Sequence, residues 1–126
     1  MCVQPRRIAV MNLYSILDRQ MPERGKIGYQ IGMKSEIYAS NRIVFVTNGI
    51  FLQRLVHSTD FFEEYPFIIL DEVHERDIDT DFILLTIKRV IRLYPKVRII
   101  LMSATIDNNL FRYYFASDHV DKILKE

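Results

Sequence analysis

The chain has 126 residues, of which 49% are hydrophobic and 26% are charged, and its formal net charge is +1. This length and composition indicate one soluble globular domain or a piece of one, and they exclude a disordered chain. No apolar run approaches the roughly 18 residues that a transmembrane helix needs, so we expect no membrane partner.

The small net charge hides an uneven distribution along the chain. Residues 1–60 contain 8 Lys and Arg against 4 Asp and Glu, whereas residues 61–126 contain 9 against 12. A basic first half suits a polyanionic partner and an acidic second half suits a metal ion or helix starts, although ordinary surface variation explains the same pattern. The single cysteine, Cys2, excludes an intrachain disulfide. We therefore expect an intracellular location, in the cytoplasm or the nucleus.

The predicted elements alternate between strands and helices. In chain order, we predict a strand at 2–4, a helix at 6–20, strands at 27–31 and 43–47, a helix at 50–56, a strand at 67–70, a helix at 82–93, a strand at 97–102 and a helix at 108–115. The runs IVFV, FIIL and VRIILM are apolar almost throughout, which is typical of strands buried on both faces of a parallel sheet. The pattern predicts an α/β fold with a mostly parallel sheet and helices on both faces.

The helix predicted at 82–93 has the clearest boundary signals. Asp79 and Asp81 stand before it, where acidic side chains favour the positive end of the helix dipole. Pro95 stops it after Tyr94, because a proline disfavours helical geometry in the residue before it.

Polar clusters end or follow four of the predicted strands. They are Gln4-Pro5-Arg6-Arg7, Thr47-Asn48-Gly49, Asp71-Glu72-Val73-His74 and Ser103-Ala104-Thr105. The carboxyl ends of parallel strands meet at one edge of a sheet, and ligands of open α/β sheets bind there. We therefore expect all four clusters to lie around one shared rim.

An apolar strand that ends in Asp-Glu matches the second nucleotide-binding signature of P-loop NTPases. In that chemistry Asp71 would help to hold Mg²⁺, directly or through water, and Glu72 would polarise the attacking water. One carboxylate is enough, since Mg²⁺ keeps several of its waters. Many strands end in acidic turns, so the signature is weak alone, but Ser103-Ala104-Thr105 at a later strand end strengthens it.

Four ordered segments carry a family resemblance. They are QPRRIAV at 4–10, TNGIFLQ at 47–53, DEVHERD at 71–77 and MSAT at 102–105. They resemble motifs Ia, Ib, II and III of the DEAH-box/RNA helicase A-like group of superfamily 2 helicases. GYQIG at 28–32 with the DEVH box is similar to the Spindle-E-type helicases, whereas DEVHERDIDTDF with YPKVRIILMSATID is similar to RNA helicase A. The motifs do not decide between these two subgroups.

The resemblance implies a RecA-like fold of the P-loop NTPase type, with ATP and Mg²⁺ as cofactors. By position, Asp71 would hold the Mg²⁺ bound to ATP, and Glu72 would orient the hydrolytic water. His74 would link the nucleotide site to a second RecA-like domain of the same protein or to motif III. Ser103 and Thr105 would bind near the nucleotide and couple hydrolysis to movement. The plainer alternative for these last three residues is a role in local turns.

The resemblance also implies RNA as a partner. Arg6 and Arg7, with Thr47 and the backbone around Gly49, would grip the RNA sugar-phosphate backbone, which carries no sequence information. The two arginines could instead be solvated helix-start residues, but basic side chains oppose the dipole there, so the fold gains little from them. Residues 75–77 are better explained as a local ion-pair and helix-start cluster than as catalytic residues.

No Gly-x-x-x-x-Gly-Lys-Thr/Ser loop occurs in the sequence, although superfamily 2 enzymes need one to hold the phosphates. We therefore expect residues 1–126 to be a partial, incomplete ATP-binding domain that covers motifs Ia to III, with a gap at the centre of its sheet. The predicted function is part of an ATP-dependent RNA helicase, with the fragment alone inactive. The alternatives are a non-catalytic RNA-binding or interaction module derived from a helicase domain, and a DNA helicase of the same superfamily.

Overall fold

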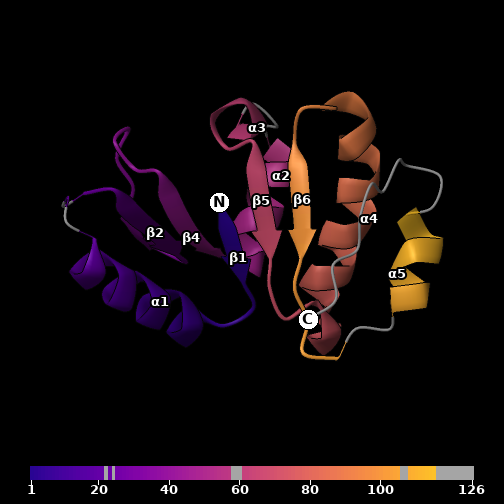
Figure 1. Cartoon of the computed structure of the whole chain (residues 1–126), viewed down its shortest axis with the longest axis horizontal. Helices are drawn as coiled ribbons and strands as arrows, with labels where there is room; N and C mark the ends of the chain where they lie inside the picture. Colours follow the sequence, from indigo (N-terminus) through magenta and orange to yellow (C-terminus); the bar gives the residue numbers. More distant parts are fainter. Residues whose placement is uncertain (22, 24, 58–60, 106–107, 116–126) are drawn as a thin grey trace.

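A six-stranded sheet forms the centre of the chain (Figure 1). The computed structural model describes residues 1–21, 23, 25–57, 61–105 and 108–115. The strands are β1 (Cys2–Gln4), β2 (Ile27–Ile31), β3 (Lys34–Glu36), β4 (Ile43–Thr47), β5 (Phe67–Leu70) and β6 (Arg98–Leu101). Their order across the sheet is β3-β2-β4-β1-β5-β6. Every pairing is parallel except the antiparallel β2–β3 pair.

Helices cover both faces of this sheet. They are α1 (Arg7–Gln20), α2 (Asn48–His57), α3 (Phe61–Glu64), a 3₁₀ turn η1 (Val73–Glu75), α4 (Ile78–Leu93) and α5 (Asn108–Phe115). Helix α1 packs against one face, and α2 and α4 pack against the other (Figure 1). The predicted α/β class, with a mostly parallel sheet, is confirmed. Among the described helices, none has the length and apolar character that crossing a membrane requires.

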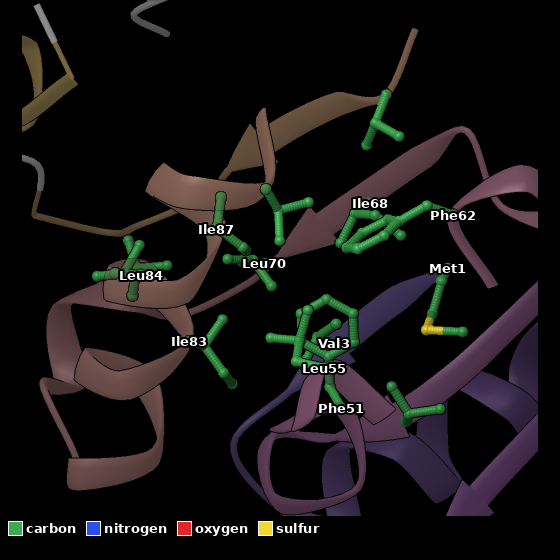
Figure 2. Packing of buried hydrophobic residues seen from close by; sticks show 14 of the residues in the cluster. Met1, Val3, Phe51, Leu55, Phe62, Ile68, Leu70, Ile83, Leu84 and Ile87 are labelled. Carbon is green, nitrogen blue, oxygen red and sulfur yellow. The ribbon is translucent and has the colours of Figure 1, made fainter. Parts of the chain in front are cut away.

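The larger core lies between the sheet and the helices α2 and α4. Alternate strand residues such as Ile68 and Leu70 point into it, because successive side chains of a strand face opposite sides. Figure 2 shows them among Phe51 of α2 and Ile83 and Ile87 of α4. Full burial of one such side chain stabilises the fold by about 1.5–3 kcal/mol relative to exposure. This packing fixes β5, and with it the acidic segment that follows.

A smaller core lies under α1, on the opposite face. Val10 of α1 packs there against Phe45 of β4 and the neighbouring strand β2. The β5–β6 half of this face has no such cover among the described residues, since Phe67 is 58% exposed and Ile100 is 43% exposed. The face that carries Cys2 and Phe45 is therefore apolar but only partly covered.

The sheet is continuous, so the expected central gap is wrong. Strand β1 pairs with β4 on one side and β5 on the other, and β5 pairs with β6. The backbone N–H of Asp71 also donates to the Val3 carbonyl at 3.1 Å. Within the described chain, the sheet ends at β6, whose outer edge carries no partner strand.

Several boundaries differ from the predicted ones. Strand β6 is one residue shorter at each end, and α2 and α4 begin at Asn48 and Ile78, earlier than predicted. Asp77 explains the second shift, because its side chain caps α4 by accepting from the Thr80 N–H at 2.7 Å. Strand β3 and the short α3 and η1 were not predicted. All three residues of β3 are exposed and polar, so no hydrophobic pattern marks it.

Candidate functional site

The four polar clusters meet at one edge of the sheet, as predicted. Gln4 of β1 lies in register with Thr47 of β4, and Val3 lies in register with Leu70, the residue before Asp71. Leu70 in turn pairs with Leu101 of β6, which is two residues before Ser103. The arrowheads of β5 and β6 point to this shared edge in Figure 1. The rim that parallel pairing implied is therefore present.

The Asp71 carboxylate is held by one donor on each oxygen. Its Oδ2 atom accepts a 2.8 Å hydrogen bond from Nε2 of Gln4, and its Oδ1 atom accepts one of 2.8 Å from the Glu72 backbone N–H. Each carboxylate oxygen has further lone-pair capacity, so the fixed side chain can still accept from a cation or from its water. The half-buried position at the rim suits a ligand of Mg²⁺, which needs few protein carboxylates.

No group of three or more His, Cys, Asp or Glu residues arranged to hold a metal ion occurs in the described part of the chain. The described residues of the rim therefore do not form a metal site made of protein ligands alone. A single fixed carboxylate, with the remaining ligands from water and phosphate, is the arrangement that its residues fit.

Glu72 stands in an unusual backbone conformation. Its φ of 56° and ψ of 35° place it in the left-handed region, which costs a residue with a Cβ about 1–2 kcal/mol. The Val73 N–H then donates to the Met102 carbonyl at 3.1 Å, which ties the segment to the chain after β6. Strain of this kind persists where surrounding contacts fix the backbone, and it gathers at functional sites.

His74 lies close to Glu72. Its Nδ1 atom is shielded from solvent and lies 3.3 Å from Oε2 of Glu72, yet the geometry falls short of a hydrogen bond. The Glu72 side chain is 42% exposed, so it faces the open side of the rim.

The rest of the acidic segment forms a helix start. Asp77 caps α4, and Arg76 donates to both carboxylate oxygens of Asp81 at 2.6 and 3.2 Å. The hydrogen bond and charge of Asp81 raise the pKa of Arg76 above its usual value. Glu75 pairs with Arg6 at 2.9 Å. The Arg76–Asp81 pair and the Asp77 cap are the local ion pair and helix start that we predicted, whereas Glu75 pairs with a residue 69 positions away.

Arg6 and Arg7 lie on the exposed side of the rim. The Arg6 side chain is 69% exposed, and the Arg7 guanidinium lies 3.4 Å from the position that a Cβ on Gly32 would take. Helix α1, which they open, has no side-chain cap and no acidic residue in its first turn. The uncapped N-terminus of α1 and the Arg7 guanidinium therefore favour anions here, and the Arg6 guanidinium is shared with Glu75.

Thr47 and Gly49 offer less to a ligand than the two arginines. Thr47 is only 9% exposed, so its hydroxyl is largely enclosed. Gly49 lies in the first turn of α2, where Oδ2 of Asp79 is 3.4 Å from the position that a Cβ on Gly49 would take. That carboxylate interacts favourably with the positive N-terminal end of α2. It also places a negative charge beside the backbone that was predicted to contact RNA.

Ser103 and Thr105 form a turn beyond β6. The Thr105 N–H donates to Oγ of Ser103 at 3.3 Å; Ser103 is half-buried and Thr105 is exposed. Among the described residues, no side-chain hydrogen bond joins either hydroxyl to the acidic segment. Their link to it is the backbone bond between Val73 and Met102.

The sequence profile of the DEAD/DEAH box helicase family matches residues 2–112. The chain belongs to this family. The match spans all four polar clusters and the sheet that arranges them, so the fold and the family assignment agree.

Curated helicases align with most of the chain. It is 39% identical over 117 residues to the "Probable ATP-dependent RNA helicase spindle-E" of Anopheles gambiae, which covers 89% of this chain. It is 38% identical over 118 residues to the human "Putative ATP-dependent RNA helicase DHX57" and 37% identical over 124 residues to the human "Probable ATP-dependent RNA helicase DHX34", covering 92% and 97% of it. The chain spans only 8%, 8% and 11% of these three relatives.

Two buried polar residues, Asn48 and Gln4, form hydrogen bonds that the sequence analysis did not predict. Asn48 is 6% exposed, and its Nδ2 atom donates to Oγ1 of Thr80 at 2.9 Å and to Oδ2 of Asp77 at 3.2 Å. Gln4 is 3% exposed and holds Asp71. The available signal was their position, since Gln4 ends the strand β1 and Asn48 directly follows the strand β4.

Proposed function

We propose that this chain is part of the first RecA-like domain of an ATP-dependent RNA helicase. One observation carries the proposal. In a chain of the DEAD/DEAH box helicase family, a strand delivers Asp71 and Glu72 to the same edge of the sheet that presents Arg6 and Arg7. Acidic groups for a metal–nucleotide and basic groups for a polyanion thus share one rim.

On the nucleotide side, each residue has a distinct task. Bound Mg²⁺–ATP supplies the phosphoryl group and neutralises its charge. Asp71, fixed on both oxygens, would hold the cation directly or through water, and Glu72 would orient the attacking water from the exposed side. The Nδ1 atom of His74 lies 3.3 Å from Oε2 of Glu72. From this position His74 would link Glu72 to a second RecA-like domain.

On the RNA side, the exposed arginines make the main contribution. Arg6 and Arg7 would bind phosphates without reading bases, as suits an enzyme that acts on many sequences. Thr47 and the backbone at Gly49 would add contacts beside them. Ser103 and Thr105, joined to the acidic segment through Val73, would transmit the nucleotide state to the rest of the domain.

Residues 1–126 are in this proposal a partial domain that is completed by a strand and helix carrying the phosphate loop. Two features support the free edge of β6 as their position. The sheet ends there within the described chain, and apolar side chains of β5 and β6, including Phe67 and Ile100, stay exposed on the face beside it. A strand paired with β6 would cover its free edge, and a helix over that face would bury Phe67 and Ile100. The 126-residue chain alone would then hydrolyse ATP poorly.

The decisive experiment is Glu72→Gln in the full-length protein that contains this segment. We expect binding of ATP to persist, while RNA-stimulated ATP hydrolysis falls by about 10²–10⁴-fold, the usual contribution of a positioned base. Glu63→Gln on the exposed surface of α3 makes the same change of charge and should leave hydrolysis unaltered. Near-normal hydrolysis in Glu72→Gln would remove Glu72 from this role. RNA binding with no hydrolysis in the wild-type protein would instead support the non-catalytic module.

A further inference from the structure

We propose that Gln4 is a positioning residue that fixes the Asp71 carboxylate for the metal–nucleotide. This inference rests on the proposed function, because it gives Asp71 the task of binding Mg²⁺. It adds a residue of β1, the strand that leads to the candidate RNA contacts, to the machinery of the nucleotide site.

The geometry leaves Gln4 little freedom. The residue is 3% exposed, and its Nε2 atom donates to Oδ2 of Asp71 at 2.8 Å. The same nitrogen lies 3.6 Å from Sγ of Cys2, so both N–H groups of the amide have an acceptor. Burial raises the pKa of the Cys2 thiol.

Electrostatics select this orientation of the amide. The reversed orientation would place the Oε1 atom of Gln4 against Oδ2 of Asp71, two acceptors with no proton between them. With Nε2 toward the carboxylate, the bond is charge-assisted and is stronger than one between neutral groups. Together with the Glu72 N–H on Oδ1, it fixes the plane of the carboxylate and so the direction of its remaining lone pairs.

Gln4 also connects two parts of the rim. Two residues later in the chain, Arg6 pairs with Glu75, which lies four residues after Asp71. The segments 4–6 and 71–75 are thus joined at a half-buried point and at an exposed point. Because exposed ion pairs contribute little, the half-buried Gln4–Asp71 bond contributes more to holding the carboxylate than the Arg6–Glu75 pair does.

The test uses the full-length protein and Mn²⁺ as a paramagnetic substitute for Mg²⁺. Gln4→Met keeps the length and approximate volume of the side chain but removes the donor. In the presence of a non-hydrolysable ATP analogue, we expect electron paramagnetic resonance to show about 10-fold weaker Mn²⁺ binding, the usual effect of losing a partner that orients a ligand. RNA affinity should stay close to wild type. Gln20→Met, at the exposed end of α1, is the matched control.

A double-mutant comparison separates positioning from a general effect on the fold. Asp71→Asn should weaken Mn²⁺ binding, and adding Gln4→Met should then cause no further loss, because the residue acts through Asp71. If Gln4→Met lowers the yield of folded protein, Gln4→Asn replaces it, since it keeps an amide but shortens its reach.

The outcomes distinguish the two proposals. Unchanged Mn²⁺ affinity in the Gln4 variant, with a clear loss in Asp71→Asn, would overturn the role of Gln4 alone. Losses that add in the double variant would overturn it as well. Unchanged affinity in Asp71→Asn would overturn the proposed metal ligand, and with it the function on which the inference rests.

Discussion

We expect Glu75→Gln to strengthen RNA binding. In the structure, Nη2 of Arg6 lies 2.9 Å from Oε1 of Glu75, so a phosphate that uses Arg6 has to compete with a carboxylate. The Arg6 side chain is 69% exposed and that of Glu75 is 27% exposed, which places the pair among surface ion pairs worth about 0.2–1 kcal/mol. Removing it should therefore lower the Kd for RNA by up to about fivefold.

Fluorescence anisotropy with a labelled single-stranded RNA, at two salt concentrations, measures this change. The gain should be larger at low salt, because exposed charges are screened as ionic strength rises. It should also disappear when Arg6→Ala is present, since no guanidinium is left to release. Glu63→Gln removes the same charge from α3, far from Arg6 in the sequence, and serves as the control. An unchanged or weaker affinity in Glu75→Gln, or an equal gain in Glu63→Gln, would refute the competition.

Three further predictions concern the scaffold of the site. Asn48→Ala should lower the free energy of unfolding in urea by about 2–4 kcal/mol, because it leaves acceptors on Thr80 and Asp77 without their donor; Asn12→Ala on the exposed side of α1 should change it little. Gly28→Ala should lower the same quantity by about 1–3 kcal/mol, because its Cβ would lie 2.8 Å from the Glu36 carbonyl, whereas Gly49→Ala meets nothing nearer than 3.4 Å. Burial and the hydrogen bond to Glu36 raise the pKa of Tyr14 to about 12, so its contribution to stability should be complete below pH 10 and should be lost as the pH rises through 12. Glu36→Gln should shift the tyrosinate absorbance titration to lower pH.

The position of the candidate site could be predicted from the sequence. Apolar runs such as Ile43–Thr47 and Phe67–Leu70 identify buried strands without any tertiary information, and parallel pairing then sends their polar ends to one edge. The register of Gln4 with Thr47 confirms that step. The roles of the individual residues stay predictions, because the arrangement shows where the side chains lie and not what they bind.

The contacts within the site could not be predicted in the same way. Gln4 meets Asp71 across 67 positions of sequence, and Arg6 meets Glu75 across 69, so each contact depends on which strands are neighbours. The order of strands was also missed, because a chain without its phosphate loop was expected to lack the middle of the sheet. Local patterns set the strands, whereas their order follows from packing and crossover connections that span the whole chain.

The acidic segment at 71–77 is the point on which these long-range contacts converge. Gln4 of β1 holds its first residue, Met102 beyond β6 accepts from Val73, Arg6 pairs with Glu75, and Asn48 of α2 donates to Asp77. Helix α4 begins directly after it, so the segment has fixed points at both ends.

These fixed points explain how the segment keeps two residues, Glu72 and Arg76, in the left-handed backbone region at φ 56° and 49°. Neither conformation is favourable alone, and each is tolerated because neighbouring contacts determine the path of the chain. A ligand that displaces Arg6 from Glu75 would remove one of these contacts while the Gln4–Asp71 bond remains. Under the proposed function, RNA bound at Arg6 would therefore act on Glu75, three residues after Glu72, and would leave the Asp71 carboxylate held by Gln4.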